Sequence, residues 1–307
     1  IHVQHLTKQF GRIRALDDLD FEINEGEIYG LLGPNGAGKS TTINILSTII
    51  LPDEGQVSIH EYDLLKEPGK CKGILGVVPQ EISIYEELTA LENLHFWGGL
   101  YGIGKSELRQ QAGNLLEMMG LSDRGHDKVS TFSGGMKRRV NIAAALLHSP
   151  KILLLDEPTV GIDPQSRNLI FNVIETLHDE GMTIIYTTHY MEEAQRLCDR
   201  IGIIDTGRII AQGTLEELRQ LTDIHECIHV EFDGELNESI SRHSFWQDHQ
   251  VNRDASSLDF FTLNSGAELP GIVSFISSQG LEILNVELRK VNLETIFLNL
   301  TGKQLRD

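Results

Sequence analysis

A glycine-rich segment near the amino end carries the residues best suited to chemistry in this chain. Gly33 is followed, after four residues, by Gly38, Lys39 and Ser40. Glycine permits backbone angles that a side chain would block, so successive N–H groups can curl around an anion at a helix start. Lys39 would then reach the β- and γ-phosphates of a nucleotide, and the Ser40 hydroxyl would bind Mg²⁺. We therefore predict that a nucleotide is bound by Gly33, Pro34, Asn35, Gly36, Ala37, Gly38, Lys39, Ser40 and Thr41.

Two acidic residues follow a second apolar segment. Residues 152–155 are all Ile or Leu, and Asp156 and Glu157 come next, before Pro158. Open α/β sheets place their ligands at the carboxyl ends of strands, where a carboxylate can hold Mg²⁺ directly or through water. We predict that Asp156 binds the metal and that Glu157 is the general base for a water attacking the γ-phosphate. The alternative is an acidic strand end followed by a proline turn, which the preceding phosphate loop disfavours.

A third candidate is the start of a predicted helix at 134–148. Ser133 is a good N-cap, and Gly134 and Gly135 leave the helix-start amides open to an anion. A plain helix cap is the better explanation of these three residues when they are taken alone. Their position shortly before the Asp156–Glu157 strand favours a role in phosphate binding.

The elements that must position these residues alternate between strand and helix up to about residue 218. Continuous apolar strands of this kind suit a parallel sheet covered on both faces. The strands are predicted at Glu27–Leu32, Ile74–Pro79, Ile152–Asp156, Met182–Thr187 and Ile201–Asp205. The helices are predicted at Lys39–Ile50, Leu88–Tyr101, Ser106–Met119, Gly134–His148, Ser166–Asp179 and Met191–Asp199. We interpret residues 81–150 as a helical subdomain inserted into an α/β core spanning 1–218.

The pattern changes over residues 219–307, which we predict to be a small α+β accessory domain. Strands are expected at 226–232, 251–252, 258–263 and 281–288, with helices at 236–246, 268–278 and 293–301. Strand-helix-strand-strand-helix-strand is a ferredoxin-like order. Phe245–Trp246 and Phe260–Phe261 are expected to be core residues rather than a ligand site.

Composition limits the classes of function. The 307 residues include 26 Lys and Arg against 45 Asp and Glu, a net charge of −19, which argues against a nucleic-acid surface. No apolar run approaches the roughly 18 residues that a membrane span needs, and the first residues do not form a signal peptide. Cys71, Cys198 and Cys227 are scattered, which is typical of reduced thiols in the cytosol.

These motifs together resemble the ATP-binding subunits of ABC transporters. The resemblance covers about residues 3–218 and rests on six elements in order. They are the loop at 33–40, Gln80 after Val77–Pro79, Ser133–Gly135, Asp156–Glu157, Gly161–Asp163, and His189 after Thr187–Thr188. It implies a P-loop NTPase fold with ATP and Mg²⁺ as ligands.

The resemblance also implies roles for single residues. Phe10 would stack on adenine, where most of the family has Tyr, although it could instead be a core residue. Gln80 would contact Mg²⁺ or the attacking water and sense the membrane partner, or it could be a turn residue. His189 would bind the γ-phosphate, or cap a strand end. In a second subunit, Ser133, Gly134 and Gly135 would bind the γ-phosphate in trans and Asp163 would bridge the two subunits.

One departure from the family concerns the Ser133–Gly135 signature. The common form is Leu-Ser-Gly-Gly-Gln, whereas this chain has Phe132 and Met136, and Met136 cannot make the hydrogen bonds of glutamine. The Ser-Gly-Gly-Met-Lys-Arg-Arg form and the tail at 293–302 are similar to the exporter branch that includes drug-resistance, antibiotic-export and sodium-extrusion ATPases. We expect retained γ-phosphate binding with altered ribose contacts.

The resemblance implies partners as well as ligands. Two identical chains are expected to close head-to-tail on two ATP molecules and to drive a separate membrane-spanning permease from the cytoplasmic face of the membrane. Two alternatives are a soluble ABC-type ATPase acting on ribosomes or chromosomes, and a regulator that binds nucleotide without hydrolysis. One unsplit cassette and an acidic balance disfavour the first, and intact Glu157 and His189 disfavour the second.

Overall fold

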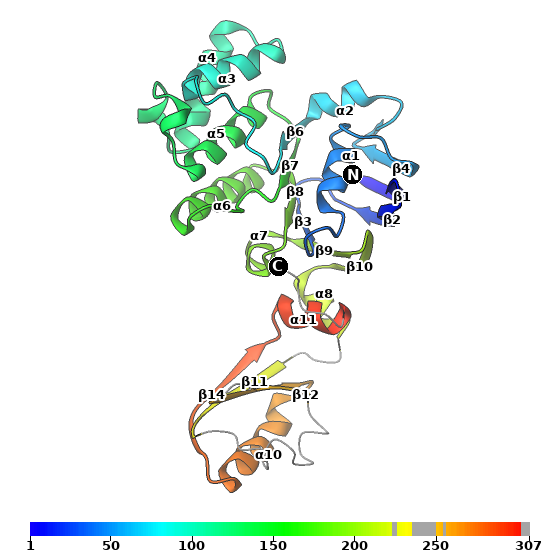
Figure 1. Ribbon diagram of the computed structural model, residues 1–307, viewed down its shortest axis with the longest axis vertical. Helices are drawn as coiled ribbons and strands as arrows, with labels where there is room; N and C mark the ends of the chain where they lie inside the picture. Colours follow the sequence, from blue (N-terminus) through cyan, green and yellow to red (C-terminus); the bar gives the residue numbers. More distant parts are fainter. Residues whose placement is uncertain (223–225, 235–249, 254–255, 302–307) are drawn as a thin grey trace. The chain divides into compact units, whose positions relative to one another are not determined.

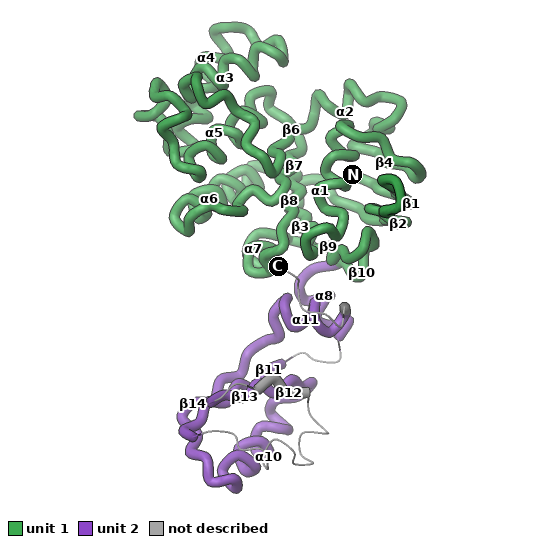
Figure 2. The backbone as a smooth tube through the Cα atoms, viewed as in Figure 1, with its two compact units in different colours: residues 1–212, 305–307 green, residues 213–304 purple. Residues whose placement is uncertain are grey.

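The computed structural model describes the chain except for residues 223–225, 235–249, 254–255 and 302–307. Two compact units are present, the first comprising residues 1–212 and the second beginning at Gly213 (Figure 2). The predicted boundary at residue 218 lies just beyond this division, because the short helix α8 (Leu215–Gln220) groups with the second unit.

A six-stranded sheet forms the centre of the first unit. Its strand order is β10-β9-β3-β8-β7-β6, and the pairs linking β9, β3, β8, β7 and β6 are parallel. The five strands predicted from apolar runs are all present. The six strands of this sheet are β3 (Ile28–Leu32), β6 (Leu75–Val78), β7 (Ile152–Asp156), β8 (Thr183–Thr188), β9 (Arg200–Asp205) and β10 (Arg208–Gly213), of which β10 was not predicted.

This central sheet is buried on both faces, which explains its continuous apolar strands. Successive strand residues point to opposite faces. Leu153 and Leu155 belong to the hydrophobic core on one face, and Ile152 and Leu154 to the core on the other. The prediction of a doubly covered parallel sheet is confirmed.

A second sheet in this unit was not predicted from the sequence. Its order is β2-β1-β4-β5 and its pairs are antiparallel. The strands are β1 (His2–Phe10), β2 (Ile13–Glu22), β4 (Glu54–Ile59) and β5 (Tyr62–Asp63). Register shifts along β1, where His5 has a φ of 53°, interrupt the alternation of buried and exposed residues that would have marked the strand.

Helices cover both faces of the central sheet. Figure 1 shows α3, α4, α5 and α6 on one side of β6, β7 and β8, with α1 and the strands β1, β2 and β4 on the other. The helices α3, α4 and α5 pack on one another within the predicted insert at 81–150. The helices are α1 (Lys39–Leu46), α2 (Pro68–Ile74), α3 (Ala90–Leu100), α4 (Lys105–Met118), α5 (Gly134–Leu146), α6 (Pro164–Asp179) and α7 (Met191–Leu197).

Helix α1 is shorter than predicted. The expectation extended it to Ile50, but it ends at Leu46 and Ser47 is its C-cap. Thr48 then takes a φ of 61°, which a continuing right-handed helix does not allow. Ile49 is therefore exposed instead of buried on a helix face.

The second unit contains a four-stranded antiparallel sheet in the order β12-β13-β11-β14. Strand β13 lies between β11 and β12, as in a split β-α-β arrangement. Phe260 and Phe261 are buried, as predicted, whereas the predicted helix at 236–246, with Phe245–Trp246, lies outside the described residues. The elements are β11 (Glu226–Asp233), β12 (Gln250–Arg253), β13 (Ser257–Thr262), α10 (Ser265–Ser278), β14 (Glu282–Lys290) and α11 (Leu293–Thr301).

Candidate functional site

The predicted phosphate loop connects β3 to α1, and its glycines are required there. Gly36 and Gly38 have φ values of 79° and 115°, in the region that side chains rarely adopt. Gly33 has no such angle, but a Cβ at this position would lie 2.1 Å from the carbonyl oxygen of Ile204. The loop therefore bends tightly into the N-terminus of α1, where free backbone amides and the helix dipole favour an anion.

Three strand ends bring the predicted site residues to one edge of the sheet. In the parallel register, Leu32 of β3 pairs with Thr188 of β8, and Asp156 of β7 pairs with Thr187. The Gly33 amide also donates a hydrogen bond of 3.3 Å to the Thr188 carbonyl. The phosphate loop, the acidic pair and His189 thus meet at the carboxyl ends of adjacent strands.

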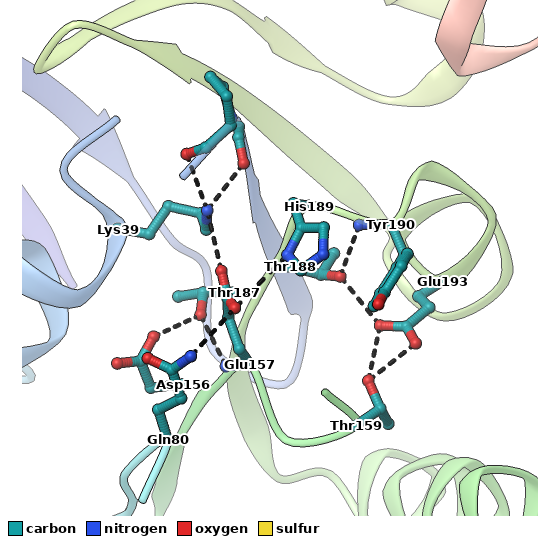
Figure 3. Close-up of polar contacts among 12 residues, drawn as sticks. Lys39, Gln80, Asp156, Glu157, Thr159, Thr187, Thr188, His189, Tyr190 and Glu193 are labelled. Atoms are coloured by element: carbon teal, nitrogen blue, oxygen red, sulfur yellow. Dashed lines mark hydrogen bonds and ion pairs between the residues drawn. The ribbon is translucent and has the colours of Figure 1, made fainter. Parts of the chain in front are cut away.

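The Glu157 carboxylate is the meeting point of these segments (Figure 3). Its Oε1 lies 2.9 Å from Lys39 Nζ, and its Oε2 lies 3.4 Å from His189 Nδ1. Gln80 Nε2 donates a long hydrogen bond of 3.5 Å to the same Oε2. The Lys39 and Glu157 side chains are only 4% and 5% exposed, so this ion pair is shielded from bulk water. The backbone of Glu157 is strained, with a φ of 45°, and such outliers cluster at functional sites.

Thr187 holds the two acidic residues in place. Its hydroxyl donates to Asp156 Oδ1 at 2.7 Å and accepts from the Glu157 amide at 2.9 Å. Asp156 is buried, and one of its oxygens keeps its capacity to accept.

A hollow of about 190 Å³ lies above this edge. It is lined by Ala15, Asn35, Gly36, Gly38, Lys39, Ser40, Thr41, Gln80 and Glu157. The residues that could hold a metal here offer a hydroxyl from Ser40, an amide oxygen from Gln80 and a carboxylate from Asp156. These hard oxygen donors fit Mg²⁺, and the buried Asp156, which does not line the hollow, suits contact through water.

Phe10 is half-exposed and does not belong to a core. It ends β1, its side chain is 48% exposed, and Lys8 Nζ lies 5.6 Å from the centre of its ring. The alternative interpretation as a core residue is therefore wrong. Phe10 does not line the 190 Å³ hollow, so any base that stacks on it extends beyond that hollow.

The Ser133–Gly135 segment does not line the hollow, and its Gly135 is buried. Ser133 and Gly134 are exposed, and the Ser133 hydroxyl accepts a hydrogen bond of 3.3 Å from the Met136 amide as the N-cap of α5. A Cβ at Gly135 would lie 2.2 Å from the Ser166 side chain on α6, so no larger residue fits without movement. Asp163 caps α6 through the Ser166 amide at 2.9 Å, and that hydrogen bond lowers the pKa of its carboxyl.

Sequence reasoning missed three side chains that hold these segments in place. They are Thr187, already described, Glu193 on α7, and Arg138 on α5. The buried Arg138 guanidinium donates to the carbonyls of Pro79 and Gln80, so it ties the Ser133 helix to the Gln80 segment. The basic run at 137–139 was visible in the sequence, but its partner 58 positions away was not.

Within the described ranges, every helix is too short or too polar to cross a bilayer.

Comparison with known proteins extends this picture. Residues 16–160 match the family described as ABC transporter. The chain is similar to the linearmycin resistance ATP-binding protein LnrL of Bacillus subtilis, with 43% identity over the full length of both chains. It is 36% identical to the daunorubicin resistance ATP-binding protein DrrA3 of Streptomyces coeruleorubidus, covering 100% of this chain and 97% of that protein. It is 35% identical to the Nod factor export ATP-binding protein I of Ralstonia nicotianae, covering 100% and 95%.

Solved structures give the same fold. An ATP-binding subunit of an ABC transporter superposes with a TM-score of 0.65 at 33% identity, covering 72% of this chain and 92% of that one. A dimeric ATP-binding cassette in a post-hydrolysis state, bound to ADP and Pi, superposes with a TM-score of 0.64 at 30% identity, covering 70% and 98%.

Proposed function

This chain belongs to the ABC transporter family of ATP-binding subunits, and from that premise we propose that it hydrolyses ATP to power a separate membrane-spanning exporter. The observation that carries the proposal is the position of Glu157. Its carboxylate contacts Lys39, Gln80 and His189, which come from three different segments. It also lines the hollow beside the phosphate loop.

Each residue has a distinct role in the proposed reaction. The loop amides and Lys39 hold the β- and γ-phosphates, and Phe10 stacks on the adenine. Glu157 accepts a proton from the attacking water, while His189 hydrogen-bonds the γ-phosphate and orients it. Bound Mg²⁺, held by Ser40, Gln80 and Asp156, would neutralise charge on the phosphates.

The proposed active form is a head-to-tail pair of chains. Ser133, Gly134 and Gly135 begin helix α5 and lie outside their own chain's hollow, and Ser133 and Gly134 are exposed, so this helix start suits the γ-phosphate of ATP held by a partner. Asp163 begins the neighbouring helix α6 and is also exposed, which suits a bridge between subunits. The similarity to a dimeric cassette bound to ADP and Pi supports this arrangement. Closure would exclude water and complete the site.

The docking site for the membrane subunit is proposed at the segment 81–87 and the adjoining helix α3. Ile82, Tyr85 and Phe96 are 36%, 46% and 40% exposed, and the rings of Tyr85 and Phe96 meet edge to face at 4.9 Å. Exposed apolar side chains gathered in this way mark an interaction surface. Arg138 on α5 donates a hydrogen bond to the Gln80 carbonyl, next to this segment. The docking segment is therefore linked through Gln80 to the site of hydrolysis. The protein would then be peripheral on the cytoplasmic side of the membrane.

The direction of transport follows from the relatives. They are named for linearmycin resistance, daunorubicin resistance and Nod factor export, which supports export of a drug, antibiotic or lipid-like cargo. These names do not favour the alternative of a soluble ATPase acting on ribosomes or chromosomes.

A phosphate-release assay on the purified chain tests the proposal. We expect ATP-dependent phosphate release that requires Mg²⁺ and stops when EDTA removes it. Nucleotide binding without phosphate release, both alone and with the co-expressed membrane subunit, would instead support the regulator hypothesis.

A further inference from the structure

Glu193 is a buried carboxylate with no part in the roles above. It lies in the first turn of α7, and its side chain is 3% exposed. Its oxygens accept hydrogen bonds from three hydroxyl groups, those of Thr159 at 2.8 Å, Tyr186 at 2.9 Å and Thr188 at 2.9 Å. Figure 3 shows the contacts with Thr159 and Thr188. Arg167 Nε is 3.8 Å away. Burying a carboxylate costs free energy unless hydrogen-bond donors surround it, and these three hydroxyls supply such donors to Glu193.

The direction of each hydrogen bond is determined by the chemistry of the donors. A carboxylate can only accept, and each hydroxyl has one proton to give. Burial and the nearby Glu193 raise the pKa of Tyr186 well above its ordinary value, so its proton stays in place. Thr188 Oγ1 accepts from the Tyr190 amide at 2.9 Å, so its own proton is free to go to Glu193.

These contacts hold the residues on both sides of His189. The hydroxyl of Thr188, the residue before His189, donates a hydrogen bond to Glu193. The amide of Tyr190, the residue after His189, donates a hydrogen bond to the same hydroxyl. Thr159 and Tyr186 provide the fixed end of the cluster, since Tyr186 lies within β8 and Thr159 follows the Glu157 turn. The backbone that carries His189 is therefore tied to the strand and turn that carry the acidic pair.

We propose that Glu193 is a positioning residue for ATP hydrolysis, which holds the Thr188–Tyr190 backbone so that His189 points at Glu157 and the γ-phosphate. The proposal rests on the proposed function of the site. Glu193 itself does not line the hollow, and its polar contacts are with the hydroxyls of Thr159, Tyr186 and Thr188 and with Arg167. The observed approach of His189 Nδ1 to Glu157, 3.4 Å, is the geometry that this clamp would maintain.

The main test compares Glu193→Ala with Glu192→Ala. Glu192 is an exposed glutamate in the same helix turn, so its substitution controls for the loss of one carboxylate. We expect Glu193→Ala to lower kcat for ATP by about tenfold while KM changes less than about threefold, because a misplaced group costs rate more than binding. Glu193→Gln keeps one acceptor oxygen and should recover most of the loss. Glu192→Ala should hydrolyse like the wild type.

A second measurement separates positioning from general loss of stability. In a His189→Ala background, Glu193→Ala should lower single-turnover phosphate release by less than about twofold, because the residue that it positions is already gone. Thr188→Val, which removes only the hydroxyl that links His189 to Glu193, should reproduce the loss if Glu193→Ala does not fold. Unchanged kcat in Glu193→Ala or in Thr188→Val, or the full loss in the His189→Ala background, would overturn the proposal. Absence of hydrolysis by the wild type would instead count against the proposed function.

Discussion

Lys39 and Glu157 form a buried ion pair across the site, with 2.9 Å between Nζ and Oε1. Lys39 Nζ also donates to the carbonyls of Gly33 and Pro34, at 2.7 Å and 3.0 Å. The lysine is thus held by its own loop on one side and by the proposed base on the other. All three protons of the ammonium therefore have a partner within the chain, so Lys39 would exchange at least one of these contacts when it binds a γ-phosphate.

Glu157→Gln should bind ATP, trap a closed dimer and nearly abolish turnover. Glutamine keeps the shape of the side chain but cannot accept a proton, and the loss of a general base typically costs about 10²- to 10⁴-fold in rate. Phosphate release gives the rate, and light scattering with ATP gives the mass of the closed pair. Hydrolysis at the wild-type rate would remove Glu157 from the role of base.

The parts of this site that could be predicted from sequence are those with local signals. The Gly33–Ser40 spacing, the apolar strand before Asp156 and the cap at Ser133 each lie within a few neighbouring residues. Because parallel strands end at one edge of a sheet, the meeting of Lys39 with Glu157 followed from assigning the two strands correctly.

The parts that could not be predicted depend on distant partners or on irregular geometry. Glu193 meets Thr159 across 34 positions, and Arg138 meets Pro79 across 59. Each of these residues reads locally as an ordinary charged residue on an amphipathic helix. The strand β1 was missed because its register shifts break the alternation that identifies a half-buried strand.

Lys39→Met should destabilise the fold as well as weaken nucleotide binding. It leaves the Glu157 carboxylate buried without its cationic partner, and breaking a buried pair typically costs about 3 kcal/mol or more. Chemical denaturation without nucleotide measures the free energy of unfolding. Adding Glu157→Gln to Lys39→Met should recover about 2 kcal/mol of that loss, because no unpaired charge remains, yet leave hydrolysis abolished. Lys151→Met, at an exposed site, is the control, and equal stability of Lys39→Met and Lys151→Met would contradict the argument.

His148 should make the stability of the chain depend on pH in the acid range. The ring stacks on Tyr101 with 3.9 Å between centroids, and its Nε2 lies 2.9 Å from the Leu75 carbonyl. Burial lowers the pKa of His148 below its ordinary value of 6.5. The unfolded chain then takes up this proton first, so the contribution of His148 is complete above pH 6.5 and is lost as the pH falls toward the lowered pKa.

His148→Gln tests this linkage. The difference in free energy of unfolding between wild type and His148→Gln should be larger near pH 7.5 than near pH 5. His95→Gln, on the exposed face of α3, controls for the loss of an imidazole. An equal wild-type advantage over His148→Gln at both pH values would contradict the assigned effect.

Ser133→Arg should leave ATP binding intact and block closure of the pair. Ser133 is exposed and does not line its own chain's hollow, so a long cation there leaves Lys39 and the phosphate loop unchanged. In the closed pair the same side chain would occupy the space of the partner's γ-phosphate. The substitution also removes the N-cap of α5, at a cost of about 1 kcal/mol.

A matched control separates closure from the lost cap. Thr89→Arg removes the N-cap hydroxyl of α3, which accepts from the Glu92 amide at 3.1 Å, and adds the same cation within the same unit. ATP-driven dimerisation, measured by light scattering in the Glu157→Gln background, should survive Thr89→Arg and be lost in Ser133→Arg. If Ser133→Arg dimerises with ATP as tightly as Thr89→Arg, the Ser133 segment does not reach a partner's nucleotide, and the head-to-tail arrangement fails with it.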